Sequence, residues 1–172
     1  MSSIVSVSDA EAADIVHACL RAGIRDYDNA PLYGSGVSEE KLGKALLSAT
    51  AESCGAEVSL DAATRELVVG GTPVRLYTKT GRLVRQLQEP PASPGELQWR
   101  PSIAEAETSS SMPQHNRVIT NDYSANGAFL SFSESQHRLG GGRLAIDTLR
   151  IHDADSNGGW TPPDQLGRQL QL

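Results

Sequence analysis

The chain has 172 residues, of which 38% are hydrophobic and only 5% aromatic, and its formal net charge is −6. This length is enough for one domain with its own, largely aliphatic core, and the acidic balance argues against a surface for nucleic acid or anionic membranes. Two cysteines make no disulfide framework, and neither a secretory signal nor a membrane-spanning apolar run is visible. We therefore expect a cytoplasmic protein that binds neither nucleic acid nor membrane.

The first predicted element is an amphipathic helix. Ser8 and Glu11 have the spacing of a capping box at its start, and Gly23 ends it. Its apolar face consists of four residues: Ile15, Val16, Cys19 and Leu20. We expect Cys19 to be a buried free thiol, whereas Cys54 lies in a polar segment and could be exposed.

A short strand, a loop and a second helix follow. Residues 24–28 read as the strand and residues 30–36 as the loop. The helix is predicted to begin near Ser38, with acidic residues in its first turn and with Leu42 and Leu46 on its apolar face. The acid at the strand end, Asp28, and the phenol of Tyr33 therefore lie at one strand-to-helix corner.

The middle of the chain is less regular. Residues 50–73 look like an insertion, in which two short strands at 57–60 and 66–69 form a hairpin around a polar turn. A clearer strand is predicted at 74–79. Residues 86–117 are rich in Pro, Ser and Glu and are interpreted as a long loop.

A third helix and a last strand complete the predicted order. The helix opens at Tyr123, its apolar face is formed by Phe129, Phe132 and Leu139, and the glycines at 140–142 end it. Residues 144–152 read as a strand, and residues 156–172 as a poorly ordered tail. Alternation of helices and strands favours a parallel α/β sheet, in which function lies at the carboxyl ends of the strands.

Four chemically matched residues fall near those strand ends: Asp28, Tyr33, Lys79 and His152. A lysine beside a tyrosine favours the phenolate, and an aspartate can hold the ammonium in place. A histidine can orient a carbonyl or assist proton transfer. This set predicts carbonyl reduction or alcohol oxidation, with the hydride supplied by a nicotinamide because no side chain can supply it.

Each of these residues alone has an ordinary structural interpretation. Asp28 alone is more simply the start of a turn before Asn29, and Lys79 alone a solvated strand end. The other histidines lack the spacing of metal ligands, so we expect no metal. The loop glycines form neither a phosphate-binding loop nor a dinucleotide fingerprint. It is the combination of the four that carries the functional prediction.

Several motifs resemble the aldo-keto reductase family. They are the run Tyr-Asp-Asn-Ala-Pro-Leu-Tyr-Gly-Ser-Gly-Val-Ser-Glu-Glu-Lys-Leu-Gly at 27–43, Thr-Lys-Thr-Gly-Arg at 78–82, Asp-Tyr-Ser-Ala-Asn-Gly-Ala at 122–128, and Ile-His-Asp at 151–153. The resemblance is to the branch of D-threo-aldose 1-dehydrogenase-like and L-galactose dehydrogenase-like members. It covers roughly residues 8–49, 74–85 and 118–155.

The resemblance implies a (β/α)8 TIM barrel, of which residues 1–155 would be about the first half. It implies a catalytic tetrad of Asp28, Tyr33, Lys79 and His152, with Asp28, Tyr33 and Lys79 beside the cofactor, NADP or NAD. A sugar or a small carbonyl compound would be the substrate. Asn29 stands where the family usually has threonine.

A complete barrel of this type needs about 250 residues, so the sequence leaves three alternatives open. The chain could be the amino-terminal half of an oxidoreductase, a non-catalytic remnant or interaction module, or a half-barrel completed by self-association or by a partner chain. Side-chain alternation places Asp26 with Asp28 and Arg150 with His152. A buried Asp26–Arg150 ion pair is therefore as plausible as two solvated charges.

Overall fold

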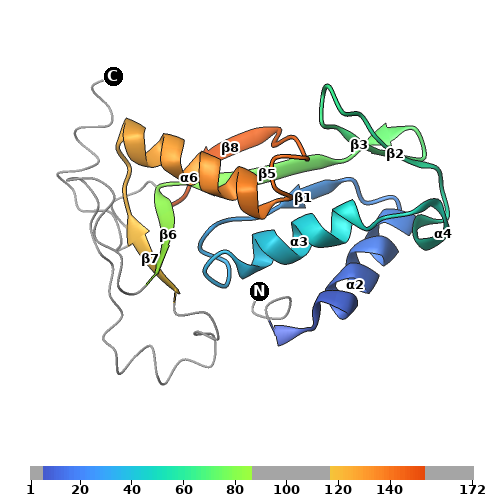
Figure 1. Cartoon of the computed structure of the whole chain (residues 1–172), viewed down its shortest axis with the longest axis horizontal. Coiled ribbons are helices and arrows are strands. Elements are labelled where there is room, and N and C mark those ends of the chain that lie inside the picture. The colour runs from blue at the N-terminus through green and yellow to red at the C-terminus, as the bar shows by residue number, and fades with distance from the viewer. Residues whose placement is uncertain (1–5, 87–116, 154–172) are drawn as a thin grey trace.

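A computed structural model describes residues 6–86 and 117–153 of the chain (Figure 1). Its main layer is a parallel sheet of β1 (Asp26–Asp28), β5 (Arg75–Thr80) and β8 (Thr148–Ile151), in the order β1-β5-β8. Three helices accompany this sheet: α2 (Asp9–Arg21), α3 (Val37–Leu47) and α6 (Ala125–Arg138). The predicted α/β order with parallel strands is therefore confirmed.

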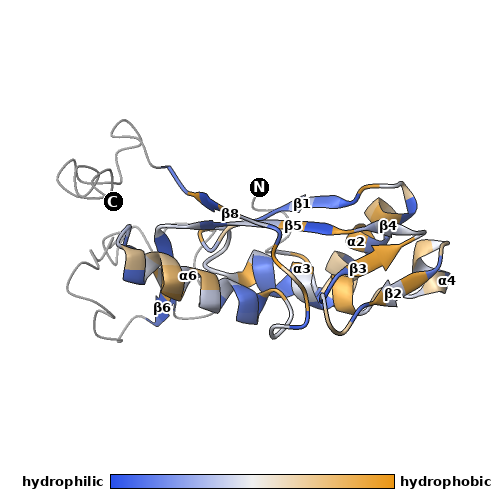
Figure 2. Cartoon of the chain, turned by 90° about the horizontal axis from the view of Figure 1, so that it is seen from above, coloured by the Kyte–Doolittle hydropathy of each residue, from blue (hydrophilic) through white to orange (hydrophobic). Residues whose placement is uncertain are grey.

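The two faces of the parallel sheet differ in chemistry. Leu76 and Thr78 of β5 are buried on the face toward α3 and α6, and Figure 2 shows these two helices on one side of the sheet. The alternate residues, Asp28 of β1 and Arg150 of β8 among them, occupy the other face, where their side chains are 43% and 53% exposed. No helix or strand of the described ranges covers that polar face.

Helix α2 begins as its sequence predicts. Ser8 Oγ accepts from the Glu11 amide at 3.2 Å, and the Ser8 amide donates to Glu11 Oε2 at 2.8 Å. Val16 and Leu20 are buried in the core, but the prediction for Ile15 is wrong, because this side chain is 48% exposed. Ala12 and His17 are also buried, so the inward face is turned toward His17 relative to the predicted one. Cys19 lies at its edge, free and only partly buried.

Helix α3 packs against the end of α6 at a glycine. A Cβ atom on Gly43 would lie 2.6 Å from the backbone carbon of Leu139 and 2.8 Å from the amide nitrogen of Gly140. The predicted apolar residues of this helix, Leu42 and Leu46, are both buried. The close approach of the two backbones therefore depends on the absence of a side chain at Gly43.

We expect Gly43→Ala to destabilise the chain by about 1–3 kcal/mol, because backbone atoms must move to admit the methyl group. In an exposed helix the same substitution would stabilise by about 1 kcal/mol, so the sign of the effect is informative. Urea denaturation followed by circular dichroism measures it. A stabilised variant would contradict the packing described here.

Residues 50–73 form a small unit at the amino-terminal end of the parallel strands. It contains α4 (Ala51–Cys54) and an antiparallel sheet of β2 (Val58–Leu60), β3 (Leu67–Val69) and β4 (Thr72–Pro73). The predicted hairpin is thus confirmed and extended by one strand. Cys54 is only 2% exposed, which corrects the expectation of an exposed thiol, since the small sheet and α2 enclose it.

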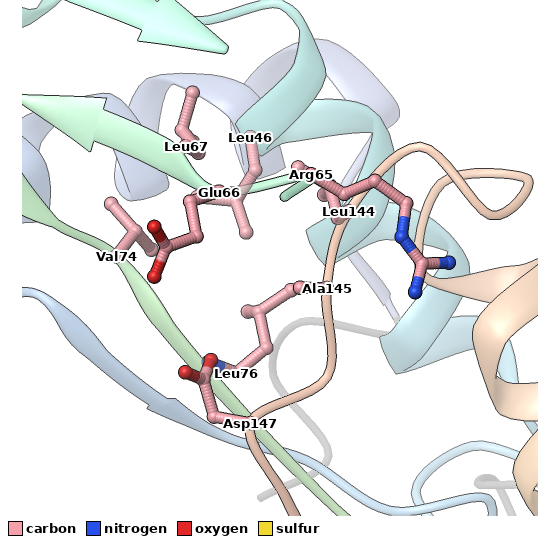
Figure 3. Close-up of a pocket in the computed structure, with 9 residues that line it drawn as sticks. All are labelled: Leu46, Arg65, Glu66, Leu67, Val74, Leu76, Leu144, Ala145 and Asp147. Atoms are coloured by element: carbon pink, nitrogen blue, oxygen red, sulfur yellow. The ribbon is translucent and has the colours of Figure 1, made fainter. Parts of the chain in front are cut away.

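A narrow pocket separates this unit from the main sheet (Figure 3). Leu46, Leu67, Leu76 and Leu144 give it an apolar lining, and Glu66 and Asp147 are its acidic residues. Arg75 pairs with both carboxylates, at 3.2 Å and 2.6 Å. The pocket lies at the opposite end of the strands from Asp28 and His152, and its polar groups fix the packing of the unit.

The structure adds a hairpin that the sequence did not predict. Strands β6 (Arg82–Gln86) and β7 (Arg117–Asn121) pair antiparallel, with Arg82 opposite Asn121. They flank the predicted loop at 86–117 and share only its first and last residues. Residues 87–116 of that loop and the predicted tail at 156–172 lie outside the described residues. The charged residues of β6 obscured its strand character in the sequence.

Helix α6 buries small polar residues instead of the predicted aromatic face. Phe129 is 73% exposed, whereas Ser131 and Ser135 are completely buried. Ser131 Oγ donates to the Arg82 backbone oxygen at 3.1 Å, so the close approach of α6 to β6 requires a small side chain. Of the predicted apolar face, Phe129 is therefore wrong, Phe132 is only partly buried, and Leu139 is confirmed at 1% exposed.

The last predicted strand is shorter than expected, because β8 begins only at Thr148 and residues 143–147 form a connection. No helix in the described ranges combines the length and the apolar character that crossing a bilayer requires.

Candidate functional site

The carboxyl end of the parallel sheet brings together the four residues that the sequence singled out. Asp28 is the last residue of β1, Lys79 the penultimate residue of β5, and His152 directly follows β8. Tyr33 lies in the loop between β1 and α3. The predicted convergence of these side chains is confirmed, and it follows from the parallel order of the three strands.

Lys79 is the centre of the cluster. Its ammonium donates to Asp28 Oδ2 at 2.7 Å and to the Asn29 backbone oxygen at 2.8 Å. The same Nζ atom lies 3.4 Å from the Tyr33 hydroxyl oxygen and 4.9 Å from the centre of the Tyr33 ring. The Lys79 side chain is only 13% exposed, so its charge acts on the phenol with limited screening by water.

Arg150 gives Asp28 a second cationic partner. Its Nη1 atom lies 3.2 Å from Asp28 Oδ1, and its guanidinium stands 5.1 Å from the centre of the Tyr77 ring. Asp26 instead accepts a hydrogen bond from the Tyr77 hydroxyl. Of the two alternatives that the sequence left open, neither is observed: Arg150 pairs with Asp28 instead of Asp26, because the register places Arg150 beside Lys79.

His152 closes the cluster on the side of Tyr33. The two ring centres are 6.0 Å apart, with the rings nearly perpendicular. His152 is 7% exposed, and this burial lowers the pKa of its imidazole, while the neighbouring Asp153 carboxylate opposes the shift. The ring is therefore neutral near pH 7 and can either donate or accept a hydrogen bond.

A buried ion pair supports the cluster from behind. Glu39 of α3 is fully buried and accepts from Thr78 Oγ1 at 2.6 Å and from Arg138 Nε at 2.7 Å. Thr78 is the neighbour of Lys79 on the opposite face of β5. Glu39 thus links the helix that follows the Tyr33 loop to the strand that carries Lys79.

Sequence reasoning missed a second group of polar residues beside His152. Arg82 and Asn121, at the base of the β6–β7 hairpin, are 2% and 3% exposed. Arg82 lies 3.3 Å from a carboxylate oxygen of Asp153. Only the adjacency of Asp153 to His152 was visible in the sequence, since the pairing of the hairpin brings Arg82 and Asn121 together. The described residues contain no cluster of His, Cys, Asp or Glu that could hold a metal ion.

The model of the Aldo/keto reductase family matches residues 2–158. A D-threo-aldose 1-dehydrogenase of a Pseudomonas species is 34% identical over 150 residues, which are 87% of this chain and 36% of the relative. A pyridoxal 4-dehydrogenase of Microbacterium luteolum is 31% identical over 148 residues, 86% of this chain and 35% of the relative.

A solved structure has the same fold. The glycerol dehydrogenase of Gluconobacter oxydans superposes with a TM-score of 0.51 and 23% identity, over 96% of this chain and 36% of the other. The described strands and helices accordingly form a partial (β/α)8 arrangement, as predicted, in which the parallel sheet does not close into a barrel. This chain spans about a third of the length of the curated relatives that it matches.

Proposed function

The chain belongs to the aldo/keto reductase family, and from that premise we propose that its cluster transfers a proton during hydride exchange between a nicotinamide nucleotide, NADP or NAD, and a small carbonyl or sugar substrate. The observation that carries this proposal is the position of Lys79 Nζ, 3.4 Å from the Tyr33 hydroxyl oxygen and 2.7 Å from Asp28. A phenol beside a held ammonium can give up and regain a proton.

Each residue has a distinct role in the proposed reaction. Tyr33 donates its proton to the carbonyl oxygen in reduction and, as phenolate, accepts it in oxidation. Lys79 stabilises the phenolate by its charge, and Asp28 keeps Lys79 in position. His152, across the Tyr33 ring, orients the carbonyl oxygen by a hydrogen bond.

The described residues fit a nicotinamide cofactor. The polar face of the sheet is open at Asp28 and Arg150, 43% and 53% exposed, and could receive a planar ring beside Tyr33. Asp28, Tyr33 and Lys79 would then lie next to the nicotinamide. When bound, the nucleotide supplies or accepts the hydride.

The names of the relatives suggest which substrates to test. One relative is named for an aldose and the other for pyridoxal, and both compounds are small molecules with a carbonyl group. We propose that this chain acts on the same class, a sugar or a small aldehyde.

Fluorescence titration with NADPH and with NADH tests the proposal directly. We expect a saturable change with one of the two nucleotides, because the open face beside Tyr33 is polar and accessible. The change should persist in Tyr33→Phe, which keeps the ring. Turnover of an aldose and of pyridoxal is then followed by the absorbance of the reduced nucleotide. Absence of a saturable change with both nucleotides would contradict the proposal.

A second candidate function is pairing with another chain that adds strands to the sheet. Leu149 and Ile151 of β8 are 38% and 60% exposed, and β1 and β8 are the outer strands of the parallel sheet. Exposed apolar side chains on an outer strand favour association. Light scattering on the purified chain would show a dimer or larger species, and a strictly monomeric sample would argue against self-association.

A further inference from the structure

The base of the β6–β7 hairpin reaches the functional cluster through one buried arginine. Arg82 begins β6 opposite Asn121, the last residue of β7. Arg82 Nη1 donates to Asn121 Oδ1 at 2.7 Å, and Nη2 donates to Asp153 Oδ2 at 3.3 Å. The planar guanidinium thus connects the hairpin to the residue that follows His152.

Asp153 is held in a conformation that few residues adopt. Its φ angle is +47°, in the left-handed region that costs backbone energy for residues other than glycine, and least for Asn and Asp. In this conformation Asp153 Oδ2 lies 3.6 Å from His152 Nε2. The distance is longer than a hydrogen bond, so the carboxylate acts on the imidazole mainly by its charge.

The backbone of His152 is fixed from two sides. Its amide donates to the Thr80 oxygen at 3.0 Å, and its carbonyl accepts from the Tyr123 hydroxyl at 2.7 Å. Tyr123 can approach only because residue 81 is glycine, where a Cβ atom would lie 2.2 Å from the Tyr123 ring. The remaining freedom of His152 is therefore in its side chain.

The imidazole itself indicates which nitrogen carries the proton. His152 Nδ1 is buried and has no hydrogen-bond partner among the described residues. An N–H group there would be a buried unsatisfied donor, which is unfavourable. The neutral ring should therefore hold its proton on Nε2, the nitrogen that faces Asp153.

We propose that Asp153 is a positioning residue for the His152 imidazole, and that Arg82 and Asn121 form a clamp that holds Asp153 in place. The carboxylate keeps the Nε2–H tautomer and favours a proton on the ring. In the proposed function His152 orients the substrate carbonyl, and the role of Asp153 rests on that function. In this proposal the β6–β7 hairpin helps to position a residue of the functional site.

Several charges face the imidazole. Asp153 and Asp28 favour its protonated form, whereas burial, Arg82 and Lys79 favour the neutral form, and burial is the largest influence on the lowered pKa of His152. The Tyr33 ring faces it edge-on. Removing the Asp153 charge should therefore lower the pKa of His152 further.

Nuclear magnetic resonance titration of the full chain tests this without any need for turnover. His152 is assigned by its loss in His152→Gln, and its pKa is compared in wild type, Asp153→Asn and Asp153→Gly. Both substitutes tolerate a positive φ, so both should fold. We expect a lower His152 pKa in both, and imidazole nitrogen shifts that report Nε2–H in the wild type. Asp14→Asn, which removes the same charge on α2, is the matched control and should leave His152 unchanged.

The proposed clamp is tested by combining Asp153→Asn with a substitution at Arg82 or at Asn121. In an Arg82→Lys background, which keeps the charge and loses the planar fork, Asp153→Asn should shift the His152 pKa less than in the wild type. Asn121→Ala provides a second background with the same expectation. If Asp153→Asn shifted the His152 pKa by the same amount in the wild type and in these two backgrounds, the proposed clamp would be wrong. A His152 pKa that moves in Asp153→Asn no more than in Asp14→Asn would overturn the role of Asp153, whereas cofactor binding would be unaffected by either outcome.

Discussion

Tyr33→Phe is expected to lower turnover by about 10²–10⁴-fold in any preparation that reduces a carbonyl or oxidises the corresponding alcohol, because it removes the hydroxyl group that carries the transferred proton. The ring stays, and with it the contact to His152 and the space beside the cofactor. Nucleotide affinity should therefore change little. Initial rates at saturating nucleotide, together with fluorescence titration, separate the two effects.

Tyr77→Phe is the matched control for this experiment. Tyr77 stands on the same face of the sheet. Its hydroxyl donates a hydrogen bond to Asp26, whereas the Tyr33 hydroxyl lies beside Lys79. Removing that hydroxyl should leave the rate within a few-fold of wild type. Lys79→Met should resemble Tyr33→Phe, since it removes the charge that favours the phenolate. Wild-type turnover in Tyr33→Phe would show that Tyr33 is not the acid.

Arg138→Met should have the largest effect on stability, a loss of about 3–5 kcal/mol, because it leaves the carboxylate of Glu39 buried without its ionic partner. Glu39 is fully buried, and its Oε2 atom lies 2.7 Å from Arg138 Nε. The substitution keeps much of the volume of the arginine stem. Denaturation in urea at pH 7 measures the change in the free energy of unfolding.

Two further variants test whether the buried ion pair causes the expected loss of stability in Arg138→Met. Glu40→Gln breaks the neighbouring pair with Arg117, whose side chains are 31% and 22% exposed, and should cost at most about 1 kcal/mol. Glu39→Met combined with Arg138→Met should recover much of the stability, since no buried charge is then left unpaired. If Arg138→Met cost no more than Glu40→Gln, the buried pair would not be a structural determinant.

The candidate site was largely visible in the sequence because its residues are tied to strand ends. Asp28, Lys79 and His152 are the last residues of the three strands that the sequence predicts at 24–28, 74–79 and 144–152. Parallel strands bring such positions to one edge of a sheet without further information. The partner of Arg150 was not predictable in the same way, because choosing between Asp26 and Asp28 requires the register of β5 against β8.

Burial was harder to predict than secondary structure. Phe129 is exposed and Ser131 is buried, although hydrophobicity ranks them in the opposite order. The reason is the close packing of α6 on β6, where only a small side chain fits. Cys54 was misjudged for a related reason, since its polar neighbours in sequence are not its neighbours in space.

Local sequence by itself determined the approximate positions of α2, α3 and α6, the alternation of strands and helices, and which residue types stand at the strand ends. These features depend on interactions within a few residues, such as the Ser8–Glu11 capping box. Only the tertiary structure decided the β6–β7 hairpin, the Glu39–Arg138 pair and the contact of Arg82 with Asp153. Each joins residues at least 31 positions apart, the separation of Gln86 and Arg117 in the hairpin. Such pairs form only after the chain has packed, so no local pattern encodes them.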